Sequence, residues 1–387
     1  MGARRGINVN IRKRSPKVVI SGYYGFDNCG DEAVLLAIIH CLRKLYPDLR
    51  ITVLSGNPAK TRKLYGVKAV NRWNPLATAT QIMSSRLLIS GGGSLLQDVT
   101  SAKSPAYYLG VISIALFLKK RVMIYGQGIG PLTGVRNRLK AVKTLNRCHA
   151  ITLRDDRSAG LLSDLGVRRD MAVTCDPVMA LERDDIYDDA VKENLRELGL
   201  FDNLGVGLNP LLFVAPRNWE DDRYISPVAE FLDRQAGDGW SVLLVPAKYP
   251  EDMDAIAKLS ARMAARSYCI DKLLTAREFM ALAALADRVF SMRLHGLICA
   301  MAMGTPMIGL SYDPKVDAFM EQAGLEKYCF SLDDFDVRTA NRLMEELDNL
   351  PYQLRQERES RRLEMQDLAW ETADVAMWLL DAPDTRQ

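Results

Sequence analysis

The chain has 387 residues, which is enough for two domains of ordinary size. Apolar residues make up 48% and charged residues 26%, and these values exclude a disordered or fibrous protein. The formal net charge of +3 gives no general reason to expect a nucleic-acid partner. Seven scattered cysteines include no CxxC pair, so we expect reduced thiols in a cytoplasmic protein.

The sequence shows neither a secretory signal nor a segment long enough to span a membrane. Residues 1–16 are basic, and no apolar core of a signal peptide follows them, so we expect a basic N-terminal tail. The longest apolar run, 106–118, is shorter than the about 18–20 residues that a membrane-spanning helix needs. That run is therefore predicted to be a buried helix.

Strand-like and helix-like segments alternate along the first half of the chain. Short apolar runs are each followed by a turn-rich stretch, and most of these by a segment with helical spacing. They lie at 17–22, 51–54, 87–90, 122–125 and 150–152. Continuous apolar strands that alternate with amphipathic helices predict a parallel sheet covered on both faces. We assign this first domain to residues 17–178.

A second series of the same kind occupies residues 179–350. Its predicted strands are 206–208, 241–245, 288–290 and 307–310. Its predicted helices are 225–235, 250–265, 276–286 and 297–303. The remaining segment, 351–387, has a long helical pattern that we expect to pack back on the first domain. The sequence thus predicts an α/β fold of two Rossmann-like parallel-sheet domains facing a cleft.

Glycine-rich loops follow three strands of the first domain, where open parallel sheets bind their ligands. In the loop at 22–33, Asn28 or Asp31 is expected to cap the next helix. The glycines at 91–93 precede Ser94, and such a flexible backbone can hold anions or sugar hydroxyls. Gln127 stands between glycines in the third loop and suits hydroxyl recognition. Simple turns that bind no ligand are the alternative for all three loops.

Two further loops offer arginine side chains. Arg154 and Asp155 follow the strand-like segment 150–152, and Arg154 is suited to hold an anion in the cleft. Arg217 stands before a tryptophan at the end of the first strand of the second domain, a pattern that suits a carboxylate or phosphate. An internal salt-bridge network at Arg154 and a plain surface loop at Arg217 are the alternatives.

The segment Arg293-Leu294-His295-Gly296 has the most specific pattern in the chain. His295 is one of only three histidines, and it stands between a predicted strand and a helix expected to begin near Gly296. Backbone N–H groups at a helix start favour an anion, and Arg293 adds positive charge. A protonated histidine in that position would serve as a general acid. Lys315, after the next strand, is expected to reach the same anion.

Several other kinds of site are not supported by the residue pattern. No group of His, Cys and Asp has metal-ligand spacing, so no metal is expected. There is no Gly-x-Ser-x-Gly elbow for a serine nucleophile, and no Walker or GxGxxG loop.

Taken together, these motifs resemble the polysaccharide pyruvyl transferase family, most closely the bacterial enzymes that pyruvylate a secondary cell-wall polymer for S-layer anchoring. The resemblance covers roughly residues 17–330. The residues that carry it are GYYGFDNCGDEA (22–33), ISGGGSLLQD (89–98), YGQGIGPL (125–132), LRDDRS (153–158), CDP (175–177) and the run from SMRLHG to GTPMIGLSYDPK (291–315).

The resemblance implies a glycosyltransferase-B-like fold and a reaction in which phosphoenolpyruvate donates pyruvate. The implied acceptor is N-acetylmannosamine in a lipid-diphosphate-linked disaccharide, and the implied product is a 4,6-linked ketal. It also implies that phosphoenolpyruvate is a substrate, with no cofactor. His295 and Lys315 match residues that the family places at the donor, with Arg293 and Arg154 as partners.

The roles expected of the individual residues follow from these two lines of reasoning. His295 is the expected general acid, with Arg293 and Asp31 as further catalytic residues, and Asp98 or Asp155 are alternatives to Asp31 as base. The expected donor-binding residues are Lys315, Arg154, Arg217, Arg293 and Gly296. The expected acceptor-binding residues are Asn28, Gly92, Gly93, Ser94 and Gln127.

The segment 132–147 indicates where a lipid-linked acceptor would bring the protein to a membrane. It holds five basic residues and no acidic one, and its apolar residues recur at helical spacing. We expect this segment to contact anionic lipid, which predicts a cytoplasmic protein at the inner face of the plasma membrane. A solvated helix face is the alternative.

Two rival functions remain open on the sequence alone. The run 300–309 resembles the sugar-nucleotide half-site of glycosyltransferases, but no glutamate stands there to hold a ribose. A non-catalytic sugar-binding or lipid-binding scaffold is the second rival, and it gives no reason for a histidine suited to acid catalysis.

Overall fold

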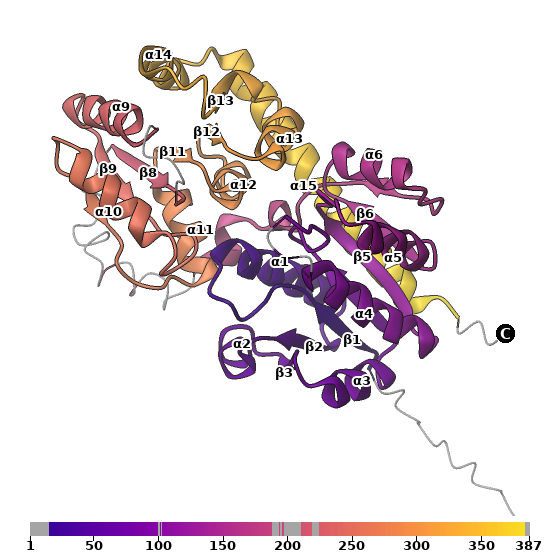
Figure 1. The fold of residues 1–387 in the computed structure, drawn as a ribbon. Helices are drawn as coiled ribbons and strands as arrows, with labels where there is room; N and C mark the ends of the chain where they lie inside the picture. The colour runs from indigo at the N-terminus through magenta and orange to yellow at the C-terminus, as the bar shows by residue number, and fades with distance from the viewer. Residues whose placement is uncertain are drawn as a thin grey trace, which may run out of the picture.

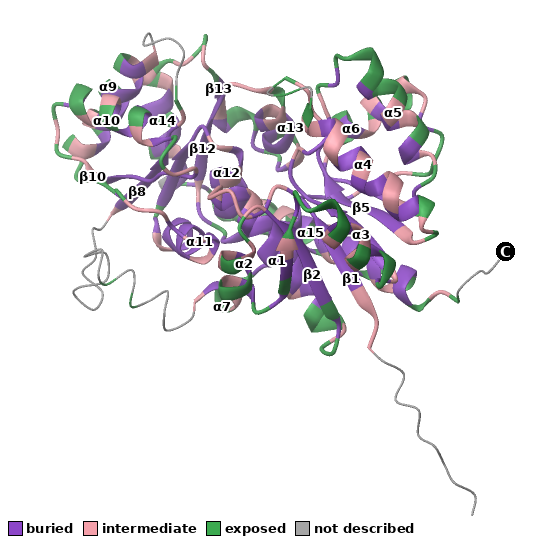
Figure 2. Cartoon of the chain, turned by 60° about the horizontal axis from the view of Figure 1, so that its bottom comes forward, coloured by how far each residue is buried: buried purple, intermediate pink, exposed green. Residues whose placement is uncertain are grey.

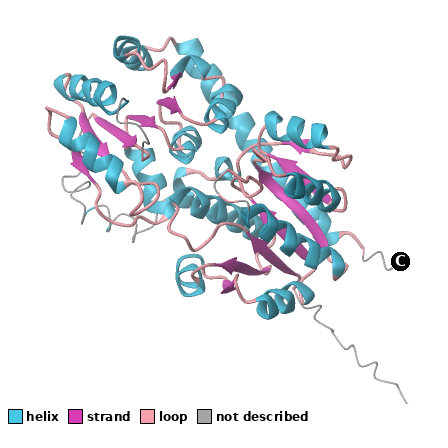
Figure 3. Ribbon diagram, viewed as in Figure 1, coloured by secondary structure: helices cyan, strands magenta, loops and turns pink. Residues whose placement is uncertain are grey.

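A computed structural model describes residues 15–99, 101, 103–187, 193, 196, 210–218 and 224–383. Two α/β domains lie side by side, each with a parallel sheet between helices (Figures 1 and 3). The first is coloured indigo to magenta in Figure 1, and the second is mainly orange. The predicted fold class is therefore confirmed.

The first sheet has seven parallel strands in the order β3-β2-β1-β4-β5-β6-β7 among the described residues. Successive residues of β1 are buried on opposite faces: Val18 and Ile20 join one apolar cluster, and Val19 joins the other. The strands are β1 (Lys17–Ser21), β2 (Arg50–Ser55), β3 (Lys68–Asn71), β4 (Leu87–Gly91), β5 (Arg121–Gln127), β6 (Ala150–Leu153) and β7 (Ala172–Val173).

Helices cover both faces of this sheet. One face packs against α1 and the long C-terminal helix α15, and the other packs mainly against α4, α5 and α6. Helices α3, α4 and α5 follow one another across that second face, because α4 contacts both α3 and α5. Their bounds are α1 (Cys29–Leu45), α2 (Pro58–Tyr65), α3 (Pro75–Met83), α4 (Lys103–Phe117), α5 (Val135–Leu145), α6 (Asp156–Leu165) and α15 (Tyr352–Asp381).

The second sheet has six parallel strands in the order β10-β9-β8-β11-β12-β13 within the described ranges. They are β8 (Leu211–Ala215), β9 (Ser241–Leu244), β10 (Tyr268–Cys269), β11 (Arg288–Ser291), β12 (Met307–Ser311) and β13 (Cys329–Ser331). The short helix η1 (Pro177–Ala180) leads out of the first domain. The others are α7 (Arg183–Ile186), α9 (Ile225–Gly237), α10 (Met253–Arg262), α11 (Ala276–Leu285), α12 (Leu294–Ala302), α13 (Pro314–Gln322), η3 (Glu326–Tyr328) and α14 (Val337–Asp348).

Two sequence-based predictions in the second domain need comment. The predicted strand 206–208 lies outside the described residues, and the first described strand of this sheet is β8. The helix expected to begin near Gly296 begins at Leu294, so that prediction was wrong by two residues. Gly296 is a packing residue instead, because a Cβ there would lie 2.3 Å from the Ser291 Oγ. His295 therefore stands inside the first turn of α12.

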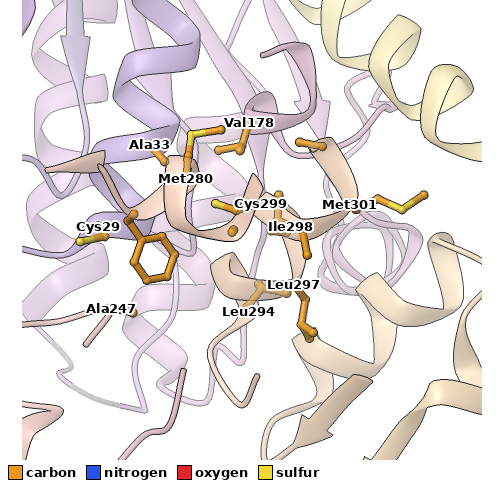
Figure 4. Packing of buried hydrophobic residues seen from close by; sticks show 14 of the residues in the cluster. Cys29, Ala33, Val178, Ala247, Met280, Leu294, Leu297, Ile298, Cys299 and Met301 are labelled. Atoms are coloured by element: carbon orange, nitrogen blue, oxygen red, sulfur yellow. The ribbon is translucent and has the colours of Figure 1, made fainter. Parts of the chain in front are cut away.

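The two domains share one apolar core, and the site lies beside it. Cys29 and Ala33 of α1, Val178 of η1 and Met280 of α11 pack toward Cys299 of α12 (Figure 4). Buried side chains also dominate this central region in Figure 2. Burial of apolar area on both sides holds the carboxyl ends of the two sheets close together.

The C-terminal helix α15 runs back over the first domain, as predicted. The Cys175 Sγ lies 2.9 Å from the Met365 carbonyl oxygen, and the hydroxyls of Thr372 and Thr174 are 2.9 Å apart. At the end of the helix, the Arg86 guanidinium donates to the Ala382 carbonyl at 2.6 Å. These contacts fix α15, which follows the second domain in the chain, to the first domain.

Two chain-wide properties complete the description. No helix in the described ranges has the length and apolar character needed to cross a bilayer. All seven cysteines are free thiols, and five of them are buried.

Candidate active site between the domains

Four of the predicted site residues come together where the two sheets meet. Asp31 follows β1, Arg154 follows β6, His295 follows β11, and Lys315 follows β12. The charges of Arg154 and Lys315 act on both Asp31 and His295, which places the four side chains in one electrostatic environment. The parallel topology places two of them at the carboxyl edge of each sheet, and the two edges meet although 284 sequence positions separate Asp31 from Lys315.

The imidazole of His295 lies at the contact between the domains. Its side chain is 15% exposed, and a Cβ on Gly30 would lie 2.4 Å from the imidazole Nδ1. Glycine is thus required at position 30 for α1 to approach the ring. Burial lowers the pKa of His295 to about 4; the Asp176 carboxylate opposes this shift, whereas Arg154 and Lys315 add to it.

Asp176 is a site residue to which the sequence analysis gave no role. Its side chain is almost fully buried, with Oδ2 lying 3.7 Å from the His295 Nε2 and 3.4 Å from the Arg154 Nη1. Its Oδ1 accepts a hydrogen bond from the Val178 backbone at the start of η1. One carboxylate therefore joins an arginine of the first domain to the histidine of the second. The only sequence signal was its place in the CDP motif.

Arg154 is buried and held on several sides. Its Nη2 donates to the Ser94 Oγ at 2.9 Å, and its Nε lies 3.4 Å from Asp155. A Cβ on Gly128 would lie 2.6 Å from the guanidinium, so the loop after β5 approaches it closely only because that residue is glycine. The internal salt-bridge network and the site position, which the sequence left as alternatives, occur together.

Asp31 has the carboxylate best suited to accept a proton. Burial and the neighbouring Glu32 raise its pKa to about 7, while Arg154 and Lys315 act in the opposite direction. Gly93 adopts a φ of +69°, and a Cβ there would lie 2.7 Å from the Asp31 Oδ1. The backbone after β4 therefore lies against this carboxyl group, with Gly92, at φ +51°, packed on Val34.

The other two carboxylates considered as bases are engaged at helix starts. Desolvation raises the pKa of Asp98, but hydrogen bonds from Thr133, Gly134 and Asn137 outweigh it and lower the pKa to about 2. Asp155 caps α6 through the Ser158 N–H at 2.7 Å. The low pKa of Asp98 makes its carboxylate a poor proton acceptor, and the Asp155 carboxylate is engaged in capping, so Asp31 is favoured over both.

Tyr312 connects the two cationic side chains predicted to bind the donor in the second domain. The Arg217 guanidinium carbon lies 4.0 Å from the centroid of the Tyr312 ring, and the Lys315 Nζ lies 5.4 Å from it. The Lys315 Nζ also lies 3.1 Å from the Asp313 Oδ2. Sequence reasoning missed Tyr312, because an aromatic residue after a strand gave no sign that it would contact two cations.

Arg293 has a partner that the sequence did not reveal. Its guanidinium donates through Nε and Nη2 to Asp252, which is fully buried. Asp252 also accepts from the backbone N–H groups of Ala247 and Lys248. Arg293 thus holds the loop after β9, and much of its charge is compensated. Its role in donor binding stays a prediction.

Two of the predicted acceptor-binding residues have structural tasks or buried positions. The Asn28 side chain caps α1 by accepting from the Gly30 N–H at 3.0 Å, and its backbone pairs with Lys248 of the second domain. Gln127 is fully buried, and neither polar atom of its amide has a hydrogen-bond partner among the described residues. Contact of either residue with an acceptor stays a prediction.

Four helices begin around this group of side chains: α1, α6, α12 and α13. The α6 and α13 starts touch, because the Arg157 Nη1 donates to the Pro314 carbonyl at 3.1 Å. Side chains cap α1, α6 and α13, whereas no side chain caps α12. Helix N-termini carry partial positive charge, so their convergence with Arg154 and Lys315 favours a small polyanion. Within the ranges that the structure describes, no group of three or more His, Cys, Asp and Glu side chains could hold a metal ion.

The titrating carboxyl of Asp31 leads to a first prediction. Because burial raises its pKa, the folded protein binds a proton more tightly than the unfolded chain, and stability falls as pH rises from about 4 to about 7. Asp31→Asn should therefore raise Tm by a few degrees at pH 8, and the gain should vanish below pH 4. Thermal unfolding across this pH range measures it. A Tm difference that does not change with pH would contradict the buried-charge explanation.

Solved structures with similar folds include a UDP-GlcNAc 2-epimerase, a protein bound to UDP-glucose and a glycosyltransferase. UDP-GlcNAc 2-epimerase of Methanocaldococcus jannaschii superposes with a TM-score of 0.66 at 10% identity, over 94% of this chain and 99% of that one. HepE of Anabaena, solved with UDP-glucose, superposes with a TM-score of 0.57 at 13% identity, over 93% of this chain and 96% of HepE. A glycosyltransferase of Rickettsia africae superposes with a TM-score of 0.59 at 10% identity, over 95% of this chain and 100% of that one. At these identities the likeness shows a glycosyltransferase-B-like fold alone.

Sequence comparison is informative at the level of the family. No curated protein is similar enough in sequence to count as a match. The family model for polysaccharide pyruvyl transferases matches residues 28–314, from the cap of α1 to the first residue of α13. That range includes Asp31, Arg154, Asp176 and His295. The chain therefore belongs to the polysaccharide pyruvyl transferase family.

Proposed function

We propose that the protein transfers pyruvate from phosphoenolpyruvate, as a 4,6-ketal, onto N-acetylmannosamine of a lipid-diphosphate-linked precursor of a secondary cell-wall polymer. The enzymes that the sequence most resembles modify such a polymer, and the modified polymer anchors an S-layer. The observation that carries the proposal is the position of His295, which lies among Asp31, Arg154, Asp176 and Lys315 at the joined helix starts.

The donor is a small polyanion and fits the charge of this group. Lys315 and Arg217, which both lie against the Tyr312 ring, supply cations from the second domain, and Arg154 supplies one from the first. The start of α12, which no side chain caps, adds the positive end of a helix dipole without a counter-charge. The Gly296 N–H itself donates to the Arg293 carbonyl at 2.9 Å, so it is not the donor expected from the sequence. Fixed cations and dipoles stabilise the phosphate as it leaves, because they need no reorganisation during the reaction.

Proton transfer divides between a histidine and a carboxylate. His295 protonates the methylene carbon of phosphoenolpyruvate, which becomes a methyl group and leaves oxocarbenium character on the neighbouring carbon. One sugar hydroxyl forms a C–O bond to that carbon and gives up its proton to Asp31. The C–O bond to phosphate then breaks, and the second hydroxyl closes the ketal. One hydroxyl proton ends on the methyl group and the other on phosphate, so the step balances.

The acceptor is assigned to the first domain. Gly92, Gly93 and Ser94 run past Asp31 and Arg154, so a sugar at this backbone would have its hydroxyls near both. A lipid-linked acceptor would bring the first domain to the inner face of the plasma membrane, through 132–147.

The protonation state of His295 gives a second prediction. With a pKa of about 4, the imidazole is neutral at pH 7 before the donor binds. The negative charge of phosphoenolpyruvate should raise that pKa, so donor binding should take up protons. Calorimetric titrations in buffers of different ionisation enthalpy measure this uptake. It should be clearly smaller in His295→Gln, and equal uptake in both proteins would exclude His295 as the group that is protonated.

The direct test is phosphate release from phosphoenolpyruvate by the purified protein in EDTA, with and without lipid-diphosphate-linked N-acetylmannosaminyl-N-acetylglucosamine. We expect release that depends on the acceptor, together with a product heavier by one pyruvate less water. Activity on a galactosyl acceptor alone would keep the chemistry and replace the acceptor. Silence with every acceptor, together with binding of a nucleoside diphosphate, would support the glycosyltransferase alternative instead.

A further inference from the structure

The first domain contains a long stretch of sequence with almost no negative charge. Residues 49–154 include 17 lysines and arginines but a single acidic residue, Asp98. The net charge of the whole chain is only +3, so the excess of positive charge in this stretch is offset elsewhere. The stretch includes α3, α4 and α5, which cover the outer face of the first sheet.

The single acidic residue does not neutralise this surface. Asp98 accepts hydrogen bonds from the backbone N–H groups of Thr133 and Gly134, at 2.7 and 2.9 Å, and from the Asn137 side chain. Its charge is therefore directed at the N-terminus of α5. Lys103, Arg136 and Lys143, which belong to α4 and α5, are exposed.

Large apolar side chains are exposed along the same edge of the domain. The exposed fractions are 63% for Trp73, 80% for Leu76, 67% for Val99, 69% for Val135 and 67% for Leu139. We call these five residues the apolar rim. They lie in the loops after β3 and β4, in the first turn of α3 and in the first two turns of α5. All are near the carboxyl end of the sheet, where the loops proposed to bind the acceptor also lie.

Contacts between neighbouring elements link the parts of the chain that carry the apolar rim. The Trp73 ring lies 5.4 Å from the ring of Tyr107, which is in α4, and the neighbouring Ala106 carbonyl accepts from the Lys140 Nζ of α5 at 3.1 Å. Val99 follows Asp98, which is bonded to the start of α5. In both Figure 1 and Figure 2, α4 lies between α3 and α5.

The exposed Trp73 is held rather than free to rotate. The guanidinium of Arg72 lies 4.9 Å from the Trp73 ring and 4.1 Å from the Tyr107 ring, and it donates to the Gly22 carbonyl at 2.9 Å. Arg72 is itself 5% exposed. An aromatic side chain fixed in an exposed position loses little entropy when it is buried by a partner.

The combination of residues decides which partner fits. Phosphates of a nucleic acid gain nothing from Leu76, Val99 or Leu139, and a second copy of this basic face would be repelled. Apolar side chains among lysines and arginines are typical of a surface that lies at the interface of an anionic bilayer.

We propose that the apolar rim, with the basic side chains around it, docks on an anionic lipid surface. This extends the contact predicted for 132–147 to α3 and to the loop after β4. The link to catalysis rests on the proposed function: Ser94 stands five positions before Val99, so a sugar at the site and its lipid at the rim would share one loop.

Co-sedimentation tests the proposal with the full chain and with vesicles of phosphatidylglycerol and phosphatidylcholine. The variant combines Leu76→Ser, Val135→Ser and Leu139→Ser, all at exposed positions. Loss of three inserted apolar side chains should weaken binding at least about tenfold. Trp73→Ala should weaken it too, whereas Trp378→Ala, on α15 and 66% exposed, is the matched control and should leave it unchanged.

Three outcomes would overturn the proposal: equal loss in Trp378→Ala, unchanged binding in the triple variant, or equal binding to pure phosphatidylcholine. Displacement of the vesicles by DNA with no effect of the apolar substitutions would assign the surface to nucleic acid. Turnover of a water-soluble acceptor should be the same in the wild type and in the triple variant. Because vesicle binding needs no turnover, a failure of the proposed reaction remains distinguishable from a failure of docking.

Discussion

Replacement of His295 by alanine is expected to lower kcat by about 10²–10⁴-fold, the range of a lost general acid. The imidazole lies against Gly30 and 3.7 Å from Asp176, and within the described residues no hydrogen bond engages its Nε2. Its removal leaves the cations in place, so KM for phosphoenolpyruvate should change far less than kcat. Steady-state phosphate release measures both quantities.

His149→Ala is the matched control for that experiment. His149 lies at the far end of the first sheet, where its Nδ1 accepts from the Val122 N–H at 3.2 Å. This variant should keep wild-type turnover. Near wild-type turnover in His295→Ala would exclude the general-acid role, and an equal loss in both histidine variants would point to folding rather than chemistry.

Asp176→Asn is expected to lower kcat by up to about 10⁴-fold, as when a carboxylate beside a catalytic histidine becomes an amide. The carboxylate opposes the effect of burial on the pKa of His295, so its loss should lower that pKa further. The alkaline side of the kcat profile, where the acid loses its proton, should therefore move to lower pH. Measurement of kcat from pH 5 to pH 9 provides the test.

The pH profile separates positioning from a general loss of structure. A variant that is merely misfolded would lose activity in equal proportion at every pH. Asp233→Asn is a suitable control, because Asp233 accepts backbone hydrogen bonds from Ala264 and Ala265 far from the site. An unshifted profile in Asp176→Asn would show that this carboxylate does not act through His295.

The sequence predicts the parts of the site that are local in the chain. His295, Arg154 and Lys315 each follow an apolar strand, so the rule for parallel sheets places each at the carboxyl edge of its own sheet without knowledge of the tertiary structure. The start of α12 was misjudged because Gly296 was interpreted as a helix boundary, whereas its backbone packs on Ser291.

The missing parts depend on contacts between distant segments. Asp176 meets His295 across 119 positions, and Asp252 meets Arg293 across 41. Neither pairing has a periodicity or a motif spacing that a single sequence reveals. The compensation of the Arg293 charge and the electrostatic environment of Asp31 follow from the way the domains pack, which sequence patterns do not encode.

The position of His295 between the domains has a consequence for its protonation. The imidazole belongs to the second domain, while the glycine and the carboxylate beside it belong to the first. A separation of only a few ångströms would take the acid away from the residues that hold it. The environment that sets the pKa of His295 therefore belongs to both domains, and a substitution in their shared apolar core, remote from the imidazole, is expected to change that pKa.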